Sequence, residues 1–243
     1  MINGLQELQL QHVITAIGGL GTAAFGLVDA AKTVPLFGGI NRIGLKHIKD
    51  RVTELTPDQN VAGLPHKPLN ALPRRHILET VEANWVNGTD IASQKAIAKS
   101  LIRLHLSEGN AAVLAARTNV DPAVLESVAK KTIEGTPLLP AESDVFSRFD
   151  LIVTALLDEA YQLSDQVYRN WTRALAAGVA VGLAMFGGWA LVGTPHFFWH
   201  REMVDAFLVG LLATPLAPIA KDLSSALATA VNTMQLVKKQ GQQ

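Results

Sequence analysis

The chain has 243 residues and a formal net charge of zero; 49% of its residues are hydrophobic and only 17% are charged, against roughly 25% charged in an ordinary soluble domain. A neutral chain has no global field that would attract nucleic acid, and the absence of cysteine excludes disulfides, thiolate metal sites and cysteine nucleophiles. The charge deficit is concentrated, because residues 174–200 contain no Asp, Glu, Lys or Arg. We therefore expect an all-α integral membrane protein with a C-terminal transmembrane helical hairpin, an N-terminal span and a small cytoplasmic helical module.

Residues 1–34 are predicted to form an apolar N-terminal helix that spans the membrane. The uncharged run Val13 to Val28 would rise only ~24 Å, so Asp29 must lie at the interface for the helix to cross a hydrocarbon core of ~30 Å. Gly18, Thr22 and Gly26 recur every four residues, and small side chains allow close helix packing in lipid. A surface-lying or soluble buried helix is the alternative. No basic residue precedes the apolar run, so we expect no cleaved secretory signal.

Residues 35–73 are interpreted as a basic juxtamembrane segment followed by a Pro-rich connector. Residues 74–142 are predicted to form a small soluble module of short helices, because helix caps recur along them. Thr89 or Asp90 can cap a helix that runs from Ile91 to Leu106, and Asp121 followed by Pro122 is a strong start signal. The module has no strongly basic face, so we expect no nucleic-acid binding.

Residues 143–173 carry the longest amphipathic pattern of the chain. One apolar stripe recurs at three- and four-residue steps; its members are Phe149, Ile152, Leu156, Ala160, Leu163 and Val167. No helix breaker follows the stripe, which predicts one continuous helix from Asp144 to Val192. The stripe either packs on the preceding module or pairs with another copy of the chain.

The transmembrane hairpin is predicted over residues 174–220. Its first leg contains 19 residues without a charge, and its second begins at Met203. Aromatic residues at both ends of the first leg are typical of a membrane interface; they are Tyr168, Trp171, Phe197, Phe198 and Trp199. The small residues Ala174, Gly178 and Gly182 form a candidate helix-packing face. Residues 221–243 are expected to be an amphipathic helix with a polar tail. A soluble core hairpin is the alternative to a membrane hairpin.

The distribution of basic residues predicts the orientation. With three spans, the basic residues that flank them fall on one side of the membrane; they are Lys32, Arg42, Lys46, Lys49, Arg169, Arg173, Lys221, Lys238 and Lys239. The positive-inside rule then places residues 41–173 and the C-terminus on the cytoplasmic or matrix side. We favour the bacterial inner membrane, and an organellar inner membrane would give the same residue pattern.

A weak metal-ligand candidate lies in the predicted turn between the two legs. His196 and His200 would share a helical face, and Glu202 could add a carboxylate. Aromatic residues separate these histidines, so an interfacial anchor is the favoured interpretation. The sequence contains no phosphate-binding loop, nucleophile elbow or zinc-protease motif. We therefore expect a protein that is not an enzyme and that has no cofactor or resident metal.

The hairpin beside amphipathic helices resembles in outline the channel domain of pore-forming colicins. The resemblance covers residues 144–237 and is architectural, because the two share no sequence motif. It implies a membrane-inserting helical domain and bears on the second of the functional hypotheses that follow.

Three functional hypotheses follow from the sequence. The leading one is a non-enzymatic membrane subunit that anchors or assembles a larger, oligomeric complex, with the bilayer, other subunits or copies of itself as partners. The second is a homo-oligomeric channel or membrane-permeabilising pore former. The third is a small transporter or lipid-handling protein, for which three short spans provide little cavity.

Overall fold

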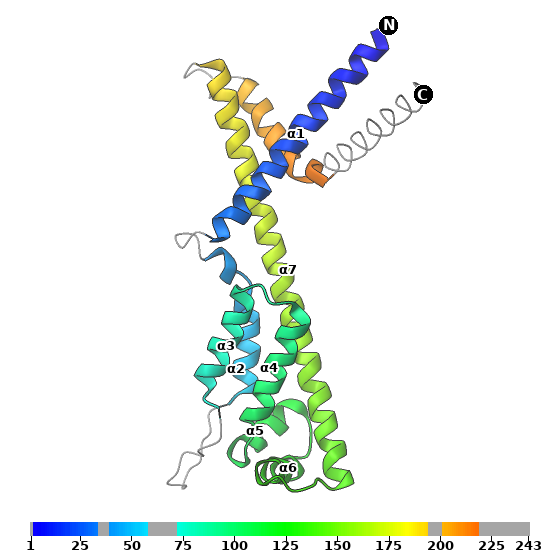
Figure 1. Ribbon diagram of the computed structural model, residues 1–243, viewed down its shortest axis with the longest axis vertical. Helices are drawn as coiled ribbons and strands as arrows, with labels where there is room; N and C mark the ends of the chain where they lie inside the picture. The colour runs from blue at the N-terminus through cyan, green and yellow to red at the C-terminus, as the bar shows by residue number, and fades with distance from the viewer. Residues whose placement is uncertain (1, 34–38, 58–71, 194–200, 219–243) are drawn as a thin grey trace, which may run out of the picture. The chain divides into compact units, whose positions relative to one another are not determined.

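The computed structural model of the chain describes residues 2–33, 39–57, 72–193 and 201–218, with side chains from Val13 onward. These residues are helical apart from turns and short connections, and no strand occurs among them (Figure 1). The prediction of an all-α protein is thus confirmed for this part of the chain.

The helices follow one another with short connections. In chain order they are α1 (Ile2–Thr33), the 3-10 turn η2 (Ile40–Arg42), α2 (Leu45–Leu55), α3 (Arg74–Val86), α4 (Ile91–His105), α5 (Glu108–Thr118), α6 (Pro122–Glu134) and α7 (Pro140–Val192). Residues 201–218 form a further helix. The predicted continuity from Asp144 to Val192 is confirmed, since α7 is a single helix of 53 residues.

The chain divides into two compact units. Unit 1 consists of Met1–Ile40 with Arg169–Gln243, and unit 2 consists of Asn41–Tyr168. Unit 2 therefore contains more than the expected module of residues 74–142, because it also includes α2 and the first part of α7. The predicted amphipathic stripe of α7 belongs to this unit: Phe149 and Ala160 are buried, whereas Leu163 is exposed.

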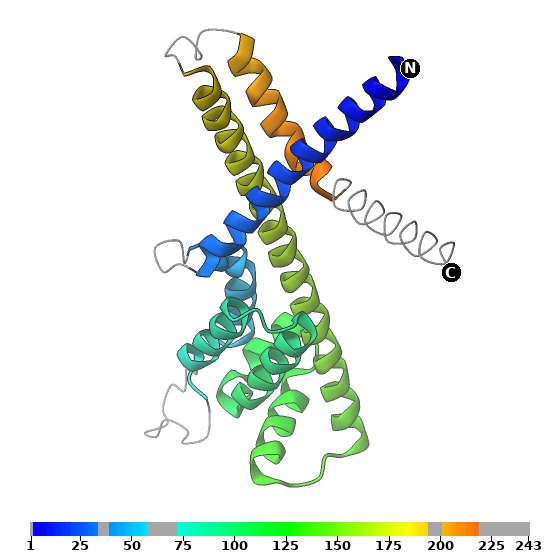
Figure 2. The ribbon, with the colours of Figure 1, turned by 45° about the horizontal axis from the view of Figure 1, so that its top comes forward.

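Unit 2 is built around one hydrophobic core. In both views α2, α3 and α4 lie side by side, and α5 and α6 lie near the start of α7 (Figures 1 and 2). The largest fully buried side chains come from all six helices; they are Ile48, Leu55, Ile77, Ile102, Leu114, Leu125, Phe149, Leu157 and Tyr161. Of the predicted stripe at the start of α7, only Phe149 and Ala160 are buried. The rest of the core face of α7 consists of Val153, Leu157 and Tyr161.

Local capping chemistry sets the helix ends of unit 2. Asp90 Oδ1 accepts a hydrogen bond from the Ser93 N–H at 2.9 Å at the start of α4. Asp121 Oδ1 does the same for Val124 at 3.0 Å, with a proline in the first turn of α6. Such caps satisfy backbone N–H groups that have no partner within the helix. The predicted starts at residues 91 and 122 are confirmed.

Ion pairs run along the surface where α4 meets α7. Lys95 pairs with Asp158, and Lys99 donates to Asp150 at 3.1 Å. Both pairs are partly exposed, so each contributes no more than about 1 kcal/mol. Both lysines belong to α4 and both aspartates to α7, so the pairs add a weak attraction between the two helices.

The N-terminus of α2 approaches the backbone of α7 closely at Gly44. This residue has a φ of 87°, a conformation that favours glycine. A Cβ added here would lie 2.4 Å from the carbonyl oxygen of Ser164. Only glycine therefore allows the chain to enter α2 at this distance from α7.

Candidate functional site

Three helices of unit 1 meet through small residues. Ala24 of α1, Ala180 of α7 and Ala213 of the helix 201–218 are fully buried in one cluster. A Cβ added to Gly21 would lie 2.0 Å from the carbonyl oxygen of Ala213. We call this cluster with its glycines the small-residue junction. Figure 2 shows α1 crossing the helix 201–218 there.

The second contact of the junction joins the helix 201–218 to α7. A Cβ added to Gly210 would lie 2.4 Å from Val181 Cα and 3.0 Å from the carbonyl oxygen of Ala180. These atoms belong to the backbone, so no side chain can move aside to make room. Glycine and alanine allow such close approach of helices, which favours van der Waals packing where no hydrophobic driving force exists.

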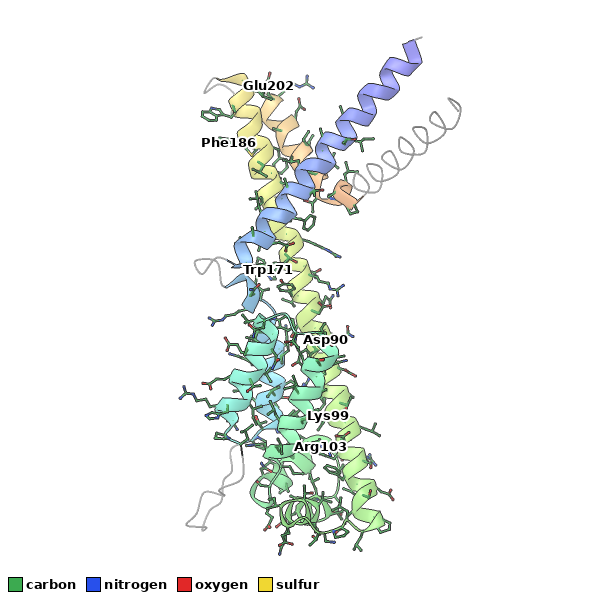
Figure 3. The ribbon with its side chains drawn as sticks, in the orientation of Figure 1. Asp90, Lys99, Arg103, Trp171, Phe186 and Glu202 are labelled. Carbon is green, nitrogen blue, oxygen red and sulfur yellow. The ribbon has the colours of Figure 1, made fainter. Side chains whose placement is uncertain are left out.

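The apolar helices of unit 1 are mostly uncovered. Two described helices are long and apolar enough to cross a membrane: Val13–Lys32 has a mean hydropathy of 1.6, and the corresponding segment of Pro140–Val192 has 2.0. Only 22% and 11% of these apolar segments, respectively, are buried within the chain. Phe186, which is 65% exposed, projects from α7 into open space (Figure 3).

The predicted helix-packing residues lie mostly on the uncovered face. Gly18 is buried, but Thr22 and Gly26 of α1 are exposed. The Thr22 hydroxyl donates to the Gly18 carbonyl at 3.0 Å, within its own helix. On α7 the predicted face is exposed as well; its members are Ala174, Gly178 and Gly182. These exposed positions make no contact in this junction, and their use in contacts with other chains stays a prediction.

The predicted interfacial and metal-binding residues fall partly outside the described residues. Phe197, Phe198, Trp199, His196 and His200 belong to the undescribed range 194–200. Trp171 is exposed and Tyr168 is half-buried. Glu202 is exposed near the start of the helix 201–218 (Figure 3). No group of three His, Cys, Asp or Glu side chains that could hold a metal ion occurs among the described residues.

Sequence reasoning missed His105, a buried side chain at the end of α4. Its Nδ1 lies 2.9 Å from the carbonyl oxygen of Leu72, and its Nε2 lies 2.9 Å from that of Pro57. These two carbonyls bracket residues 58–71. Each ring nitrogen lies at hydrogen-bond distance from a backbone carbonyl, so this histidine ties Pro57 and Leu72 to the end of α4. No sequence motif marks it.

Sequence reasoning also missed Glu142, a carboxylate surrounded by donors where α6 meets the start of α7. Glu142 accepts hydrogen bonds from the Lys131 ammonium at 2.7 Å, the Leu139 N–H at 2.8 Å and the Ser127 hydroxyl at 2.7 Å. These donors, Lys131 first among them, lower the pKa of Glu142 to about 2. The carboxylate is fully satisfied by donors of its own chain, so its role is structural: it joins the end of α6 to the start of α7.

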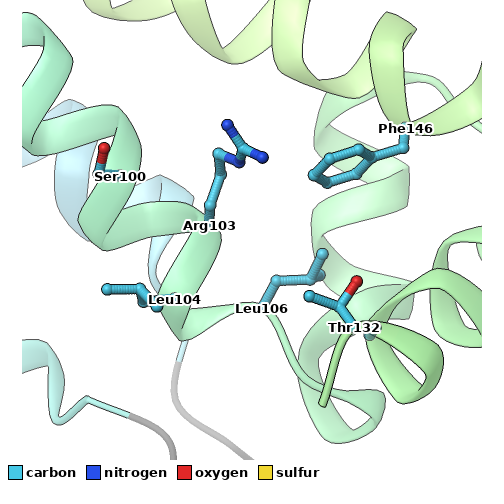
Figure 4. Close-up of a pocket in the computed structure, with 7 residues that line it drawn as sticks. Ser100, Arg103, Leu104, Leu106, Thr132 and Phe146 are labelled. Atoms are coloured by element: carbon cyan, nitrogen blue, oxygen red, sulfur yellow. The ribbon is translucent and has the colours of Figure 1, made fainter. Parts of the chain in front are cut away.

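A cavity of about 450 Å³ in unit 2 lies between α4, α6 and α7 (Figure 4). Its lining is mostly apolar and consists of Ser100, Arg103, Leu104, Leu106, Ala129, Thr132 and Phe146. The Arg103 guanidinium lies 5.1 Å from the centre of the Phe146 ring, within cation–π distance. The lining contains apolar side chains and the Arg103 guanidinium. It could therefore accept an apolar side chain beside an anionic group.

A smaller cavity of about 210 Å³ lies where α3, α4 and α7 meet. Its lining residues are Asn41, Trp85, Val86, Gly88, Ile91, Gln94, Asp165 and Tyr168. The rings of Trp85 and Tyr168 have centroids 6.0 Å apart and planes at 81° to one another. Aromatic faces, an amide and a carboxylate thus converge here.

Comparison with known proteins identifies no relative. No family model, curated protein or solved structure matches the chain significantly. A functional assignment therefore depends on the residues of this chain alone.

Proposed function

We propose that this protein is a non-enzymatic helical membrane subunit that anchors or assembles a larger complex. The single observation that supports this most strongly is the low burial of its apolar helices, 22% for the segment in α1 and 11% for that in α7. A core helix of a soluble protein would be mostly buried, because exposing apolar surface to water costs about 25 cal/mol per Å². A bilayer removes that cost.

The small-residue junction supports the membrane half of the proposal. Helices in lipid associate by close packing, and Gly21 and Gly210 are positions where a single added carbon would contact the backbone of a neighbouring helix. In this proposal α1, the apolar part of α7 and the helix 201–218 are three spans. Residues 41–173 then face the cytoplasm or matrix.

Membrane insertion and topology can be tested directly. We expect the protein to stay in the membrane fraction after alkaline carbonate extraction, which releases peripheral proteins. The chain has no cysteine, so in a single-cysteine variant all labelling comes from the introduced residue and shows on which side of the membrane that residue lies. An impermeant maleimide should label Thr136→Cys only after the cytoplasmic side is opened, and Thr194→Cys in intact spheroplasts. Release by carbonate, or labelling of both variants from the same side, would contradict three spans.

The assembly half of the proposal is supported by surfaces that unit 2 leaves open. Leu104, at the edge of the larger cavity, is 64% exposed, and Ile133 and Leu139 are also exposed. Native mass measurement in mild detergent should give a complex or an oligomer. A monodisperse monomer at high protein concentration, together with no partner after native purification, would count against anchoring or assembly.

A pore former is the competing function, and ion flux separates the two. The buried face of the junction consists of alanine and glycine, with no charged residue among its described members. Such a face suits helix packing better than a wetted channel. We expect no ion flux across proteoliposome membranes, as followed by a fluorescent indicator of the ion. Flux that increases with the protein-to-lipid ratio would instead support an oligomeric pore.

A further inference from the structure

Two cations share one carboxylate at the cavity between α4, α6 and α7. Lys99 Nζ lies 3.1 Å from Asp150 Oδ2, and Arg103 Nη1 lies 3.9 Å from Asp150 Oδ1. The longer separation is an ion pair without a hydrogen bond, and Asp150 Oδ1 has no hydrogen-bond partner among the described residues. One positive charge is therefore in excess. Arg103 lines the cavity and its side chain is 47% exposed, so this excess charge is accessible there.

Aromatic packing positions the Arg103 guanidinium. It lies 5.1 Å from the centre of the Phe146 ring, and this ring stacks on Phe149 with centroids 6.1 Å apart. Phe149 is fully buried, so the stack is anchored in the core of unit 2. Figure 4 shows the guanidinium extending from α4 towards the Phe146 ring. A guanidinium placed over a ring keeps its N–H groups in its own plane, where they can donate to a carboxylate as a fork.

The other walls of the cavity are mostly apolar. Thr132 contributes a hydroxyl that already donates to the Val128 carbonyl at 2.7 Å. No Asp or Glu occurs among the described lining residues, so no lining carboxylate repels an anion. The carbon-rich part of the lining consists of Leu104, Leu106, Ala129 and Phe146. A ligand that matches these walls has one anionic group and an apolar body.

We propose that this cavity binds an aliphatic monocarboxylate. Arg103 holds the carboxylate, and the apolar lining removes the alkyl chain from water. A volume of about 450 Å³ equals roughly fifteen water molecules, which exceeds the space that a chain of about eight carbons needs. Leu104, 64% exposed at the edge of the cavity, leaves the site open to solvent. The site lies in unit 2, so this inference does not depend on the proposed membrane anchoring.

A free acid fits this lining better than a peptide segment of a partner. A peptide would also bring an apolar side chain and a carboxylate, but with them come backbone N–H and C=O groups that need partners. Apart from Arg103, the polar side chains of the lining are Ser100 and Thr132. The Thr132 hydroxyl hydrogen is already used. An alkyl chain with a single carboxylate leaves no such group unpaired.

The test measures binding of radiolabelled octanoate to the full-length protein in phosphatidylcholine nanodiscs. Equilibrium dialysis gives the bound fraction, and empty nanodiscs give the uptake by lipid alone. We expect saturable binding above that background, with a dissociation constant on the order of 0.1–1 mM for so small a ligand. Octylammonium has the same chain and the opposite charge, and it should displace octanoate at least about tenfold less effectively. Butanoate, with its much shorter chain, should also be at least about tenfold less effective.

Two variants and a matched control test the residues. Arg103→Gln removes the positive charge and should weaken octanoate binding about tenfold. Leu104→Ala removes apolar lining at an exposed position and should weaken binding about threefold. Arg117→Gln, at an exposed arginine of α5 outside the lining, should leave binding unchanged. Circular dichroism and the melting temperature show that each variant is folded.

Three results would overturn the proposal. They are an absence of saturable octanoate binding to folded protein, binding to Arg103→Gln as tight as to the parent, and displacement by octylammonium as effective as by octanoate. N-acetylleucine, which carries a carboxylate, an apolar side chain and a peptide group, tests the other occupant. We expect it to displace octanoate about tenfold less effectively than unlabelled octanoate does. Displacement at least as effective would assign the cavity to a peptide segment and overturn the proposal of an aliphatic acid.

Discussion

Replacing Gly210 by alanine should separate the helices of the small-residue junction. The new Cβ would lie 2.4 Å from Val181 Cα and 2.9 Å from Val181 N, whereas non-bonded carbon atoms prefer about 3.5–4.0 Å. The helix 201–218 and α7 must therefore move apart by about 1 Å. Overpacking of this kind costs about 1–3 kcal/mol, and it exceeds the gain of up to about 1 kcal/mol from better helix propensity.

Matched glycines on α7 provide the control. A Cβ added to Gly178 or Gly182 meets no atom within 4 Å, so Gly178→Ala and Gly182→Ala should be neutral or slightly stabilising. The three variants can be compared by equilibrium unfolding in detergent, followed by circular dichroism. We expect the free energy of unfolding to fall for Gly210→Ala and not for the other two variants. Equal stability of Gly210→Ala and Gly178→Ala would refute the packing described for this junction.

Three further predictions concern unit 2. The pKa of Glu142 is held at about 2 instead of 4.5, so the stability that this carboxylate contributes is complete above pH 4.5 and is lost as pH falls towards 2. The difference in melting temperature between wild type and Glu142→Gln should therefore shrink as pH is lowered from 4.5 to 2. A difference that stays constant would contradict this. Gly44→Ala should destabilise by about 2–4 kcal/mol through strain and collision with Ser164. Gly88→Ala, which has a positive φ but open space, should cost only the strain, about 1–2 kcal/mol; similar losses for the two would mean that no collision occurs. Phe149→Ala should cost about 3–5 kcal/mol in chemical denaturation, and Leu151→Ala, at a 69% exposed position, about 0.5 kcal/mol or less.

The sequence alone determined the starts of α4 and α6 and the continuity of α7. Asp90, Asp121 and Pro122 act on N–H groups only two or three residues away, so the information for a helix start is local. Residues 143–173 contain no Pro or Gly, and the glycines beyond them are isolated or lie in an apolar segment. Nothing in that stretch interrupts the backbone hydrogen bonds, and the predicted single helix follows.

Tertiary structure decided which small residues pack and which residues share a cavity. The periodicity of α1 indicated Gly18, Thr22 and Gly26, but the helix turns Gly21 and Ala24 towards its neighbours. Small residues occur on several faces of this helix, so rotation about its axis is set only by the partner helices. Likewise Trp85, Gln94 and Asp165 are distant in sequence, and only the packing of α3, α4 and α7 brings them to one cavity.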